Sequence, residues 1–234
     1  MKSRGDDLLN RRGFMVRAGT GAAGLAGATI LGAAGTLALP AIARAAAGDP
    51  VVEFIRTNCG EETARPRILV GYASLCGSTG GIAEAIGKKL CAAGARVDVK
   101  HLPDVTDLAG YQAFVLGSPI QAGMWMSEAT KFIMANREEL AKAPVAYFIA
   151  CMALSVDNAE SRKMAQGYVE RPLKLAPKIK PVALGAFAGA VDYAKMPKRY
   201  YAVMRSIHPK DQDARDWEKI GEWGEELAGQ MVKK

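Results

Sequence analysis

The chain has few of the residues that bind metals. It contains two histidines and four cysteines, Cys59, Cys76, Cys91 and Cys151, among its 234 residues. No two cysteines form a Cys-x-x-Cys pair, so a zinc or iron–sulfur site has little support. A disulfide framework is also not expected in a domain of this size. We therefore predict no metal site.

A large excess of one charge is also absent from most of the chain. The formal net charge is +7, but residues 1–45 hold six basic and two acidic residues. Subtracting these from the 31 basic and 24 acidic residues leaves 25 and 22, a net charge of +3. No basic run with interleaved aromatic residues follows. We therefore expect no nucleic-acid partner.

Three motifs of phosphate-handling proteins are missing as well. The chain has no Gly-x-Gly-x-x-Gly and no Gly-Lys-Ser/Thr, which disfavours a dinucleotide fingerprint and a nucleotide triphosphatase. A Cys-based phosphatase with Cys-x5-Arg would need an arginine where Ile82 stands. Without that arginine a phosphoryl group would lack its bidentate partner.

The N-terminal segment is typical of a signal peptide. Residues 1–17 are polar and basic, residues 18–43 are apolar and rich in Ala and Gly, and small residues follow. A segment dominated by Ala and Gly has little transfer free energy into lipid, so it makes a poor stop-transfer helix. We predict that residues 1–47 are a cleaved signal, with an uncleaved membrane anchor as the alternative.

The stretch Asn10–Val16 resembles the twin-arginine export motif. Arg11, Arg12 and Phe14 match that motif, whereas the neighbouring positions depart from it. The resemblance implies export of a folded protein, with any cofactor loaded in the cytoplasm. We therefore predict a periplasmic protein, or one associated with the membrane outside the cytoplasm.

The rest of the chain alternates between strand and helix patterns. Residues 48–66 are predicted to be a linker or extension, because Pro and Gly interrupt any regular pattern there. Short apolar runs predict five strands, and periodic segments between them predict helices. The predicted strands are Arg67–Ala73, Arg96–Leu102, Ala113–Gly117, Val145–Cys151 and Val182–Val191. The predicted helices follow the first strand and occupy Ser127–Leu140, about 158–175 and about 213–231.

This alternation predicts an α/β fold for residues 67–234. Strands that alternate with helices form a parallel sheet covered on both faces. Five strands suggest the flavodoxin-like doubly wound order 2-1-3-4-5. Ligands of such sheets bind beyond the carboxyl ends of the strands, which here are the loops after the first, third and fourth strands.

The loop after the first strand has the chemistry of a phosphate site. It comprises Ser74, Leu75, Cys76, Gly77, Ser78 and Thr79, and it opens a helix. Small residues let a phosphate reach the backbone N–H groups at the helix N-terminus, and the hydroxyls add donors. The loop holds no Lys or Arg, which favours holding a phosphate monoester over phosphoryl transfer. The alternative is an ordinary turn with a capping hydroxyl.

This loop resembles the phosphate signature of the flavodoxin family, with Cys76 at a position where a hydroxyl residue is usual. The resemblance continues in Val115–Ile120, in Leu184–Tyr193 and in Arg215–Glu218. The last two stretches are similar to the flavodoxin-type protoporphyrinogen oxidases. The resemblance implies an FMN-binding redox protein. Because the flavin itself supplies the chemistry of such a protein, no catalytic side chain is predicted.

Two further loops are predicted to contact the flavin ring. One supplies Ser118, Pro119, Ile120, Gly123 and Trp125, where Trp125 either stacks on the ring or packs into the core. The other supplies Cys151 and Met152, and it lacks the aromatic residue that flavodoxins often place there. Cys151 is expected to be a buried small residue rather than a redox thiol.

The long segment 192–212 is basic and rich in tyrosine. Such a segment could contact a membrane surface, a quinone or an acidic redox partner, or simply pack on the domain. We therefore predict an exported FMN-dependent oxidoreductase, with a quinone-linked dehydrogenase as the form that the resemblance favours. A non-enzymatic electron carrier and a flavin-free binding module on the same fold are the alternatives.

Overall fold

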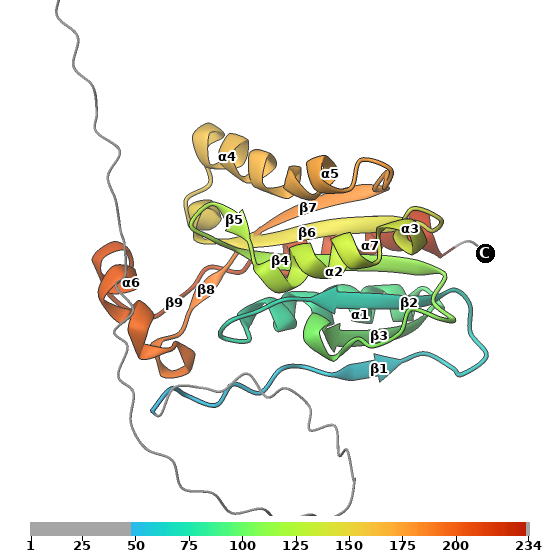
Figure 1. The fold of residues 1–234 in the computed structure, drawn as a ribbon, viewed down its shortest axis with the longest axis horizontal. Coiled ribbons are helices and arrows are strands. Elements are labelled where there is room, and N and C mark those ends of the chain that lie inside the picture. The colour runs from blue at the N-terminus through green and yellow to red at the C-terminus, as the bar shows by residue number, and fades with distance from the viewer. Residues whose placement is uncertain (1–47, 233–234) are drawn as a thin grey trace, which may run out of the picture. The chain divides into compact units, whose positions relative to one another are not determined.

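A computed structural model describes residues 48–232 (Figure 1). The predicted signal segment, residues 1–47, lies outside the described residues. Five parallel strands form the centre of the sheet, in the order β3-β2-β4-β6-β7. This order confirms the predicted flavodoxin-like topology. The five strands are β2 (Arg67–Tyr72), β3 (Arg96–His101), β4 (Ala113–Gln121), β6 (Val145–Cys151) and β7 (Ala183–Ala188).

Helices cover both faces of the sheet. The helices α1 (Ser78–Ala92) and α7 (Trp217–Met231) pack on one face, where alternate residues of β2 such as Val70 meet them. The helices α2 (Ser127–Ala135) and α4 (Ala159–Val169) pack on the other face. Two shorter helices, α3 (Arg137–Leu140) and α5 (Arg171–Leu175), extend α2 and α4.

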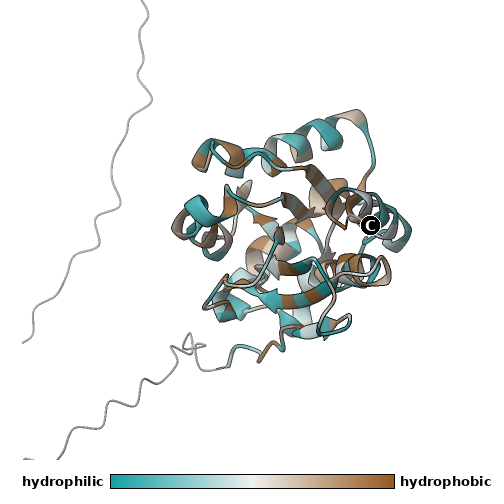
Figure 2. Cartoon of the chain, turned by 90° about the vertical axis from the view of Figure 1, so that its right-hand side faces the viewer, coloured by the Kyte–Doolittle hydropathy of each residue, from teal (hydrophilic) through white to brown (hydrophobic). Residues whose placement is uncertain are grey.

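The central strands β2, β4 and β6 are buried on both faces over most of their length, as expected of a parallel sheet between two helix layers. All seven residues of β6 are buried. The helices carry both hydrophilic and hydrophobic residues, as amphipathic helices on a sheet do (Figure 2). The packing between β4 and β6 requires Gly117, because a Cβ atom there would lie 2.0 Å from the Phe148 ring. Within residues 48–232, no helix is long and apolar enough to cross a membrane.

Several elements depart from the predicted pattern. The extension contains a strand, β1 (Thr57–Cys59), which pairs antiparallel with β3 and covers the edge of the sheet. The predicted fifth strand breaks at Gly189, and its remainder, β8 (Ala190–Val191), pairs with β9 (Gln212–Asp213) in a separate ribbon. Between them lie α6 (Tyr201–Ile207) and the 3-10 turns Tyr193–Lys195 and Lys198–Tyr200. A two-residue strand, β5 (Met124–Trp125), folds back on β4. Two more 3-10 turns follow β3 and β6, at Leu102–Asp104 and Met152–Ser155.

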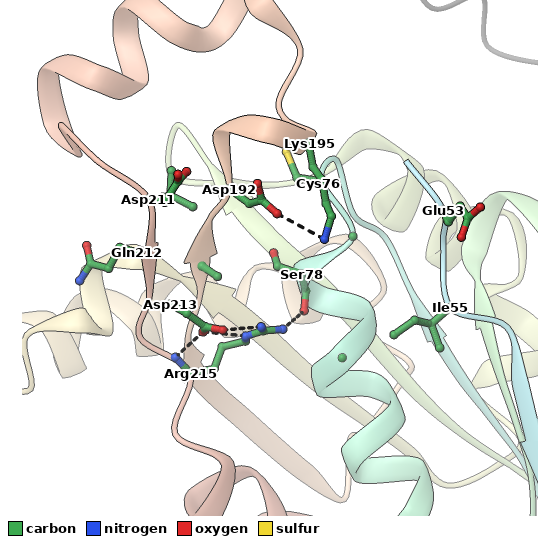
Figure 3. A pocket seen from close by; sticks show the side chains of 14 residues that line it. Glu53, Ile55, Cys76, Ser78, Asp192, Lys195, Asp211, Gln212, Asp213 and Arg215 are labelled. Carbon is green, nitrogen blue, oxygen red and sulfur yellow. Dashed lines mark hydrogen bonds and ion pairs between the residues drawn. The ribbon is translucent and has the colours of Figure 1, made fainter. Parts of the chain in front are cut away.

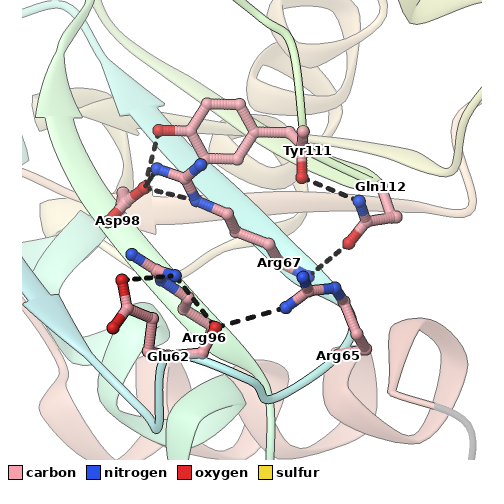
Figure 4. A network of polar contacts seen from close by, with 8 residues as sticks. Glu62, Arg65, Arg67, Arg96, Asp98, Tyr111 and Gln112 are labelled. Carbon is pink, nitrogen blue, oxygen red and sulfur yellow. Dashed lines mark hydrogen bonds and ion pairs between the residues drawn. The ribbon is translucent and has the colours of Figure 1, made fainter.

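A polar network joins three segments at the opposite end of the sheet from the predicted phosphate loop (Figure 4). The buried carboxylate of Asp98 accepts hydrogen bonds from Arg67 Nε at 3.0 Å and Nη2 at 2.6 Å. It also accepts one from the Tyr111 hydroxyl at 2.7 Å. Burial alone would raise the pKa of Asp98, but the hydrogen bonds from Tyr111 and Arg67 outweigh it and lower that pKa. The carboxylate therefore stays charged inside the fold.

Candidate functional site

The predicted phosphate loop forms a tight turn between β2 and α1. The Ser74 hydroxyl oxygen accepts a hydrogen bond from the Gly77 N–H at 2.9 Å. Gly77 has φ of +84°, a left-handed conformation that glycine adopts without strain. Ser74 therefore stabilises the shape of the loop, and the next residue after Gly77, Ser78, begins the helix.

The start of α1 presents donors that the described part of the chain does not use. No side chain within residues 48–232 caps this helix N-terminus. The Thr79 hydroxyl is fully buried, and its oxygen has no hydrogen-bond partner among the described residues. A buried polar atom without a partner is unusual in a folded protein, and a ligand oxygen would supply the partner that is lacking here. At a helix N-terminus, the fitting ligand is an anion.

A cavity of about 590 Å³ lies beside this helix terminus. Cys76, Gly77 and Ser78 form part of its wall, and most of the rest comes from the extension, the β8–β9 ribbon and residues next to that ribbon, Arg215 included (Figure 3). The cavity therefore joins parts of the chain that lie more than a hundred residues apart.

Arg215 brings a positive charge to the loop. Its Nη1 donates a hydrogen bond to the Ser78 carbonyl at 3.0 Å, and its Nε and Nη2 donate to Asp213 at 2.8 and 2.5 Å. The guanidinium also stacks on the Trp217 ring, 4.5 Å from its centroid. The loop itself holds no Lys or Arg, so the sequence predicted neutral donors alone. The sequence signal for this charge is the Arg215–Glu218 stretch, whose resemblance to the oxidases does not reveal the contact with Ser78.

Acidic residues around the cavity are engaged in other contacts. Asp192 lies 3.3 Å from the Lys195 ammonium group, and Asp211 accepts a hydrogen bond from the Tyr193 N–H at 2.7 Å. The hydrogen bond from Arg215 lowers the pKa of Asp213. For Asp192 and Asp213, the repulsion that the carboxylate would exert on an anion is thus partly offset by a neighbouring cation.

Cys76 faces apolar neighbours, which does not favour thiol chemistry. It packs with Val191, Met196 and Met152 in a small cluster under the 3-10 turns. Burial raises the pKa of this thiol to about 11, so it is neutral at pH 7. This packing explains why a thiol stands where the resembled signature has a hydroxyl. It also brings together the loops that follow β2 and β6, because Met152 belongs to the second of them.

The loop after β4 is fixed by its own contacts. The Ser118 hydroxyl donates to the Pro119 carbonyl at 2.8 Å and accepts the Met126 N–H at 2.9 Å. The chain then reverses through Ala122 and Gly123, both with positive φ. Ser118 therefore holds the loop in place, while Pro119, Ile120 and Gly123 lie at the edge where the parallel strands end.

Trp125 belongs to the core, which corrects its assignment as a ring-stacking residue. Only 4 % of its surface is exposed, and its Nε1 donates to the Tyr168 carbonyl at 2.8 Å. Its ring meets the Tyr147 ring edge to face, with 5.8 Å between centroids. Of the two alternatives for this residue, the structure shows the packing one.

Cys151 is the last residue of β6 and is buried. Burial raises the pKa of its thiol, in line with the expectation that it is a packing residue. The adjoining Met152 is half-buried and reaches the Cys76 cluster. Only Met152 of this pair lies near the cavity, and no aromatic side chain stands in Met152–Ser155.

The extension crosses the site, which its sequence did not reveal. Val52 and the Glu53 carbonyl lie within 3.6 Å of where a Cβ atom of Gly77 would stand. The Ile55 carbonyl accepts a hydrogen bond from the Tyr72 hydroxyl at 3.0 Å.

Phe54 of the extension stacks on His101, with 3.8 Å between ring centroids. Burial, the largest influence, lowers the pKa of His101, so the ring meets Phe54 in its neutral form at pH 7.

The chain matches a family model and is similar to several solved structures. The family model described as Flavodoxin domain matches residues 69–216, more than half of the chain. No curated protein matches the chain. Among solved structures, flavodoxin 2 from Bacillus cereus is 23% identical, with a TM-score of 0.45, and the match covers 70% of this chain and 99% of that one. A Fusobacterium nucleatum flavodoxin bound to flavin mononucleotide is 14% identical, with a TM-score of 0.41 and coverage of 70% and 98%. The two-electron reduced flavodoxin of Megasphaera elsdenii is 16% identical, with a TM-score of 0.43 and coverage of 69% and 99%.

Proposed function

Because the chain belongs to the flavodoxin-domain family, we propose that the loop Ser74–Thr79 binds the phosphate of FMN and that the protein transfers electrons through this cofactor. One observation carries the proposal: the Thr79 hydroxyl is buried without a partner, at an uncapped helix N-terminus, among the described residues. A phosphate oxygen would satisfy this hydroxyl and the first N–H groups of α1 together.

Different residues of the site would make different contributions to holding FMN. Ser78 and Thr79 supply hydroxyl and backbone donors, while Ser74 and Gly77 keep the loop in shape. Arg215 supplies a positive charge beside them. When bound, FMN accepts and donates electrons, and the protein sets its orientation and its access to water and partners.

The ring of FMN would rest mainly on loop backbone and on Met152. Trp125 is buried, and the segment after β6 has no aromatic side chain. We infer that the flavin ring is held by the residues Pro119–Gly123 and by the turn that begins at Met152, rather than between two aromatic rings.

We propose further that the protein works outside the cytoplasm, as a quinone-linked dehydrogenase that resembles protoporphyrinogen oxidase. The signal-like residues 1–47 support export, and the resemblance of Leu184–Tyr193 and Arg215–Glu218 supports the enzyme class. The segment around α6 supports contact with an anionic membrane surface. It exposes Val203 and Ile207, each 63 % exposed, next to several basic residues, Lys198, Arg199, Arg205 and Lys210.

The absorption spectrum of the purified full-length protein tests the cofactor. We expect a flavin spectrum and release of a chromophore with the mass of FMN. If the protein is purified without flavin, titration should show tight uptake of FMN and much weaker uptake of riboflavin, which lacks the phosphate. A colourless protein that takes up no FMN would favour the flavin-free binding module instead. Quinone reduction by porphyrinogen and by other donors then separates a dehydrogenase from an electron carrier.

Replacing Arg215 by Gln should weaken FMN binding about fivefold, because a positive charge next to the phosphate is lost from a partly screened position. Riboflavin binding should change little, since riboflavin carries no phosphate charge. The matched control is Arg137→Gln, which removes a surface charge from α3. Equal FMN affinities for the Arg215 and Arg137 variants would refute the role of Arg215.

A further inference from the structure

The extension forms one wall of the proposed FMN site. Residues Glu53 and Ile55 line the cavity, and Val52 lies against Gly77 of the loop. Arg56 pairs with Asp104 at 2.8 Å, so the extension follows the surface after it leaves the cavity. Any movement of the extension would therefore open the site on this side.

The far end of the extension is the strand β1, which pairs with β3 at the edge of the sheet and contacts α1 on one face. In β1, Cys59 stands opposite Val97 of β3. Opposite residues in an antiparallel pair project to the same face. Val97 Cγ1 lies 3.4 Å from where a Cβ atom of Gly87 would stand, so this face is the one that α1 covers.

Two cysteines meet at this contact. The Cys59 thiol donates a weak hydrogen bond to the Gly87 carbonyl at 4.0 Å. Cys91 lies one helical turn after Gly87, and both cysteines are half-buried against the same core cluster. Burial and the neighbouring Cys91 thiol raise the pKa of Cys59 to about 12. The other two cysteines, Cys76 and Cys151, lie in different clusters.

We propose that Cys59 and Cys91 form a disulfide that clamps the extension over the FMN site. The oxidant is a small-molecule disulfide such as glutathione disulfide. One protein thiolate attacks it to form a mixed disulfide, and the second thiolate displaces the remaining glutathione. The two protein thiols thus lose two electrons and two protons, and two molecules of glutathione thiol are released. The effect on FMN rests on the proposed function, whereas the bond itself does not.

The bond should form slowly and stabilise the fold. A buried thiol with a raised pKa yields little thiolate at neutral pH, so oxidation should be faster at alkaline pH. The bond would close a loop of about 33 residues and restrict the unfolded chain, which should raise the melting temperature by about 5–10 °C. With the extension held down, FMN should dissociate at least roughly threefold more slowly.

The experiment oxidises the full-length protein with glutathione disulfide at pH 8.5, then alkylates the remaining thiols and maps the peptides by mass spectrometry. We expect a peptide pair joined through Cys59 and Cys91, with Cys76 and Cys151 alkylated. Cys59→Ser and Cys91→Ser should each abolish the joined pair and the gain in melting temperature. The Cys76→Ser variant keeps both Cys59 and Cys91, so it should still yield the joined peptides and the gain in melting temperature. Alkylation of both Cys59 and Cys91 after oxidation would overturn the proposal.

The rate of FMN dissociation is then compared between oxidised and reduced protein. A bridge that forms without slowing dissociation would overturn the clamp. If the protein binds no FMN, the proposed function fails, and the joined peptides and the melting temperature still decide whether the bond exists.

Discussion

Replacing Thr79 by Val should weaken FMN binding by about 10- to 100-fold while leaving the flavin-free protein at least as stable as wild type. A hydrogen bond to a charged group contributes about 1.5–3 kcal/mol, which corresponds to this loss of affinity. In the flavin-free protein the hydroxyl is buried without a partner among the described residues. Since such a group costs about 1–3 kcal/mol, its removal should increase the free energy of unfolding.

The two measurements are an FMN titration and a urea unfolding curve without FMN. Thr130→Val is the matched control, because the Thr130 hydroxyl is already bonded to the Ser127 carbonyl at 3.1 Å in α2. That variant should lose a little stability and keep its FMN affinity. A Thr79→Val protein with wild-type affinity would show that the hydroxyl does not face the phosphate. A Ser74 variant is a less direct test, because Ser74 also holds the loop in shape.

Replacing Arg67 by Met should lower the free energy of unfolding by about 2–4 kcal/mol at pH 7. The change leaves the Asp98 carboxylate, whose side chain is 9% exposed, with one partner in place of two. Removing one partner of a buried ion pair leaves an uncompensated buried charge. The resulting loss in the free energy of unfolding is larger than the contribution of the intact pair. Urea unfolding of both proteins measures the difference.

The pH dependence of this loss has a definite sign. In wild type the pKa of Asp98 is lowered, so its stabilisation is present above the ordinary pKa of about 4 and is lost as the pH falls below it. Without Arg67, burial should raise that pKa, so protonation relieves the cost of the buried charge as the pH falls. The deficit should therefore be largest at pH 7 and smaller near pH 4. The control Lys142→Met breaks an exposed pair with Glu139 and should leave the free energy of unfolding almost unchanged. A similarly small loss for Arg67→Met would contradict the argument.

The sequence predicted the sheet well because its signal is local. Runs such as Ile68–Tyr72 and Val145–Cys151 are apolar throughout, and only strands buried on both faces are usually so. The loop after β2 was found for the same reason, since its small and hydroxyl residues are consecutive. The strand order followed from the alternation of strands and helices together with the handedness of crossovers.

The parts that were missed depend on contacts between distant residues. Arg215 contacts Ser78 although the two residues lie 137 positions apart in the sequence, and no pattern around either residue predicts the contact. The strand β1 has only three residues, and it forms because it pairs with β3. The sequence does not decide between two roles for Trp125, because its neighbours, Tyr147 and Tyr168, come from other elements. In each case tertiary packing decided the structure, and local preference did not.

The cavity beside α1 has a consequence for the order of events during synthesis. Its walls come from the extension, from the loop before α1 and from residues as late as Arg215. A ribosome releases the loop long before it releases Arg215, so the early part of the chain waits in the cytoplasm with an unfinished binding site. FMN uptake would then mark the moment at which the whole chain has been made and folded. A bound flavin would therefore distinguish a complete, folded chain from an unfinished one.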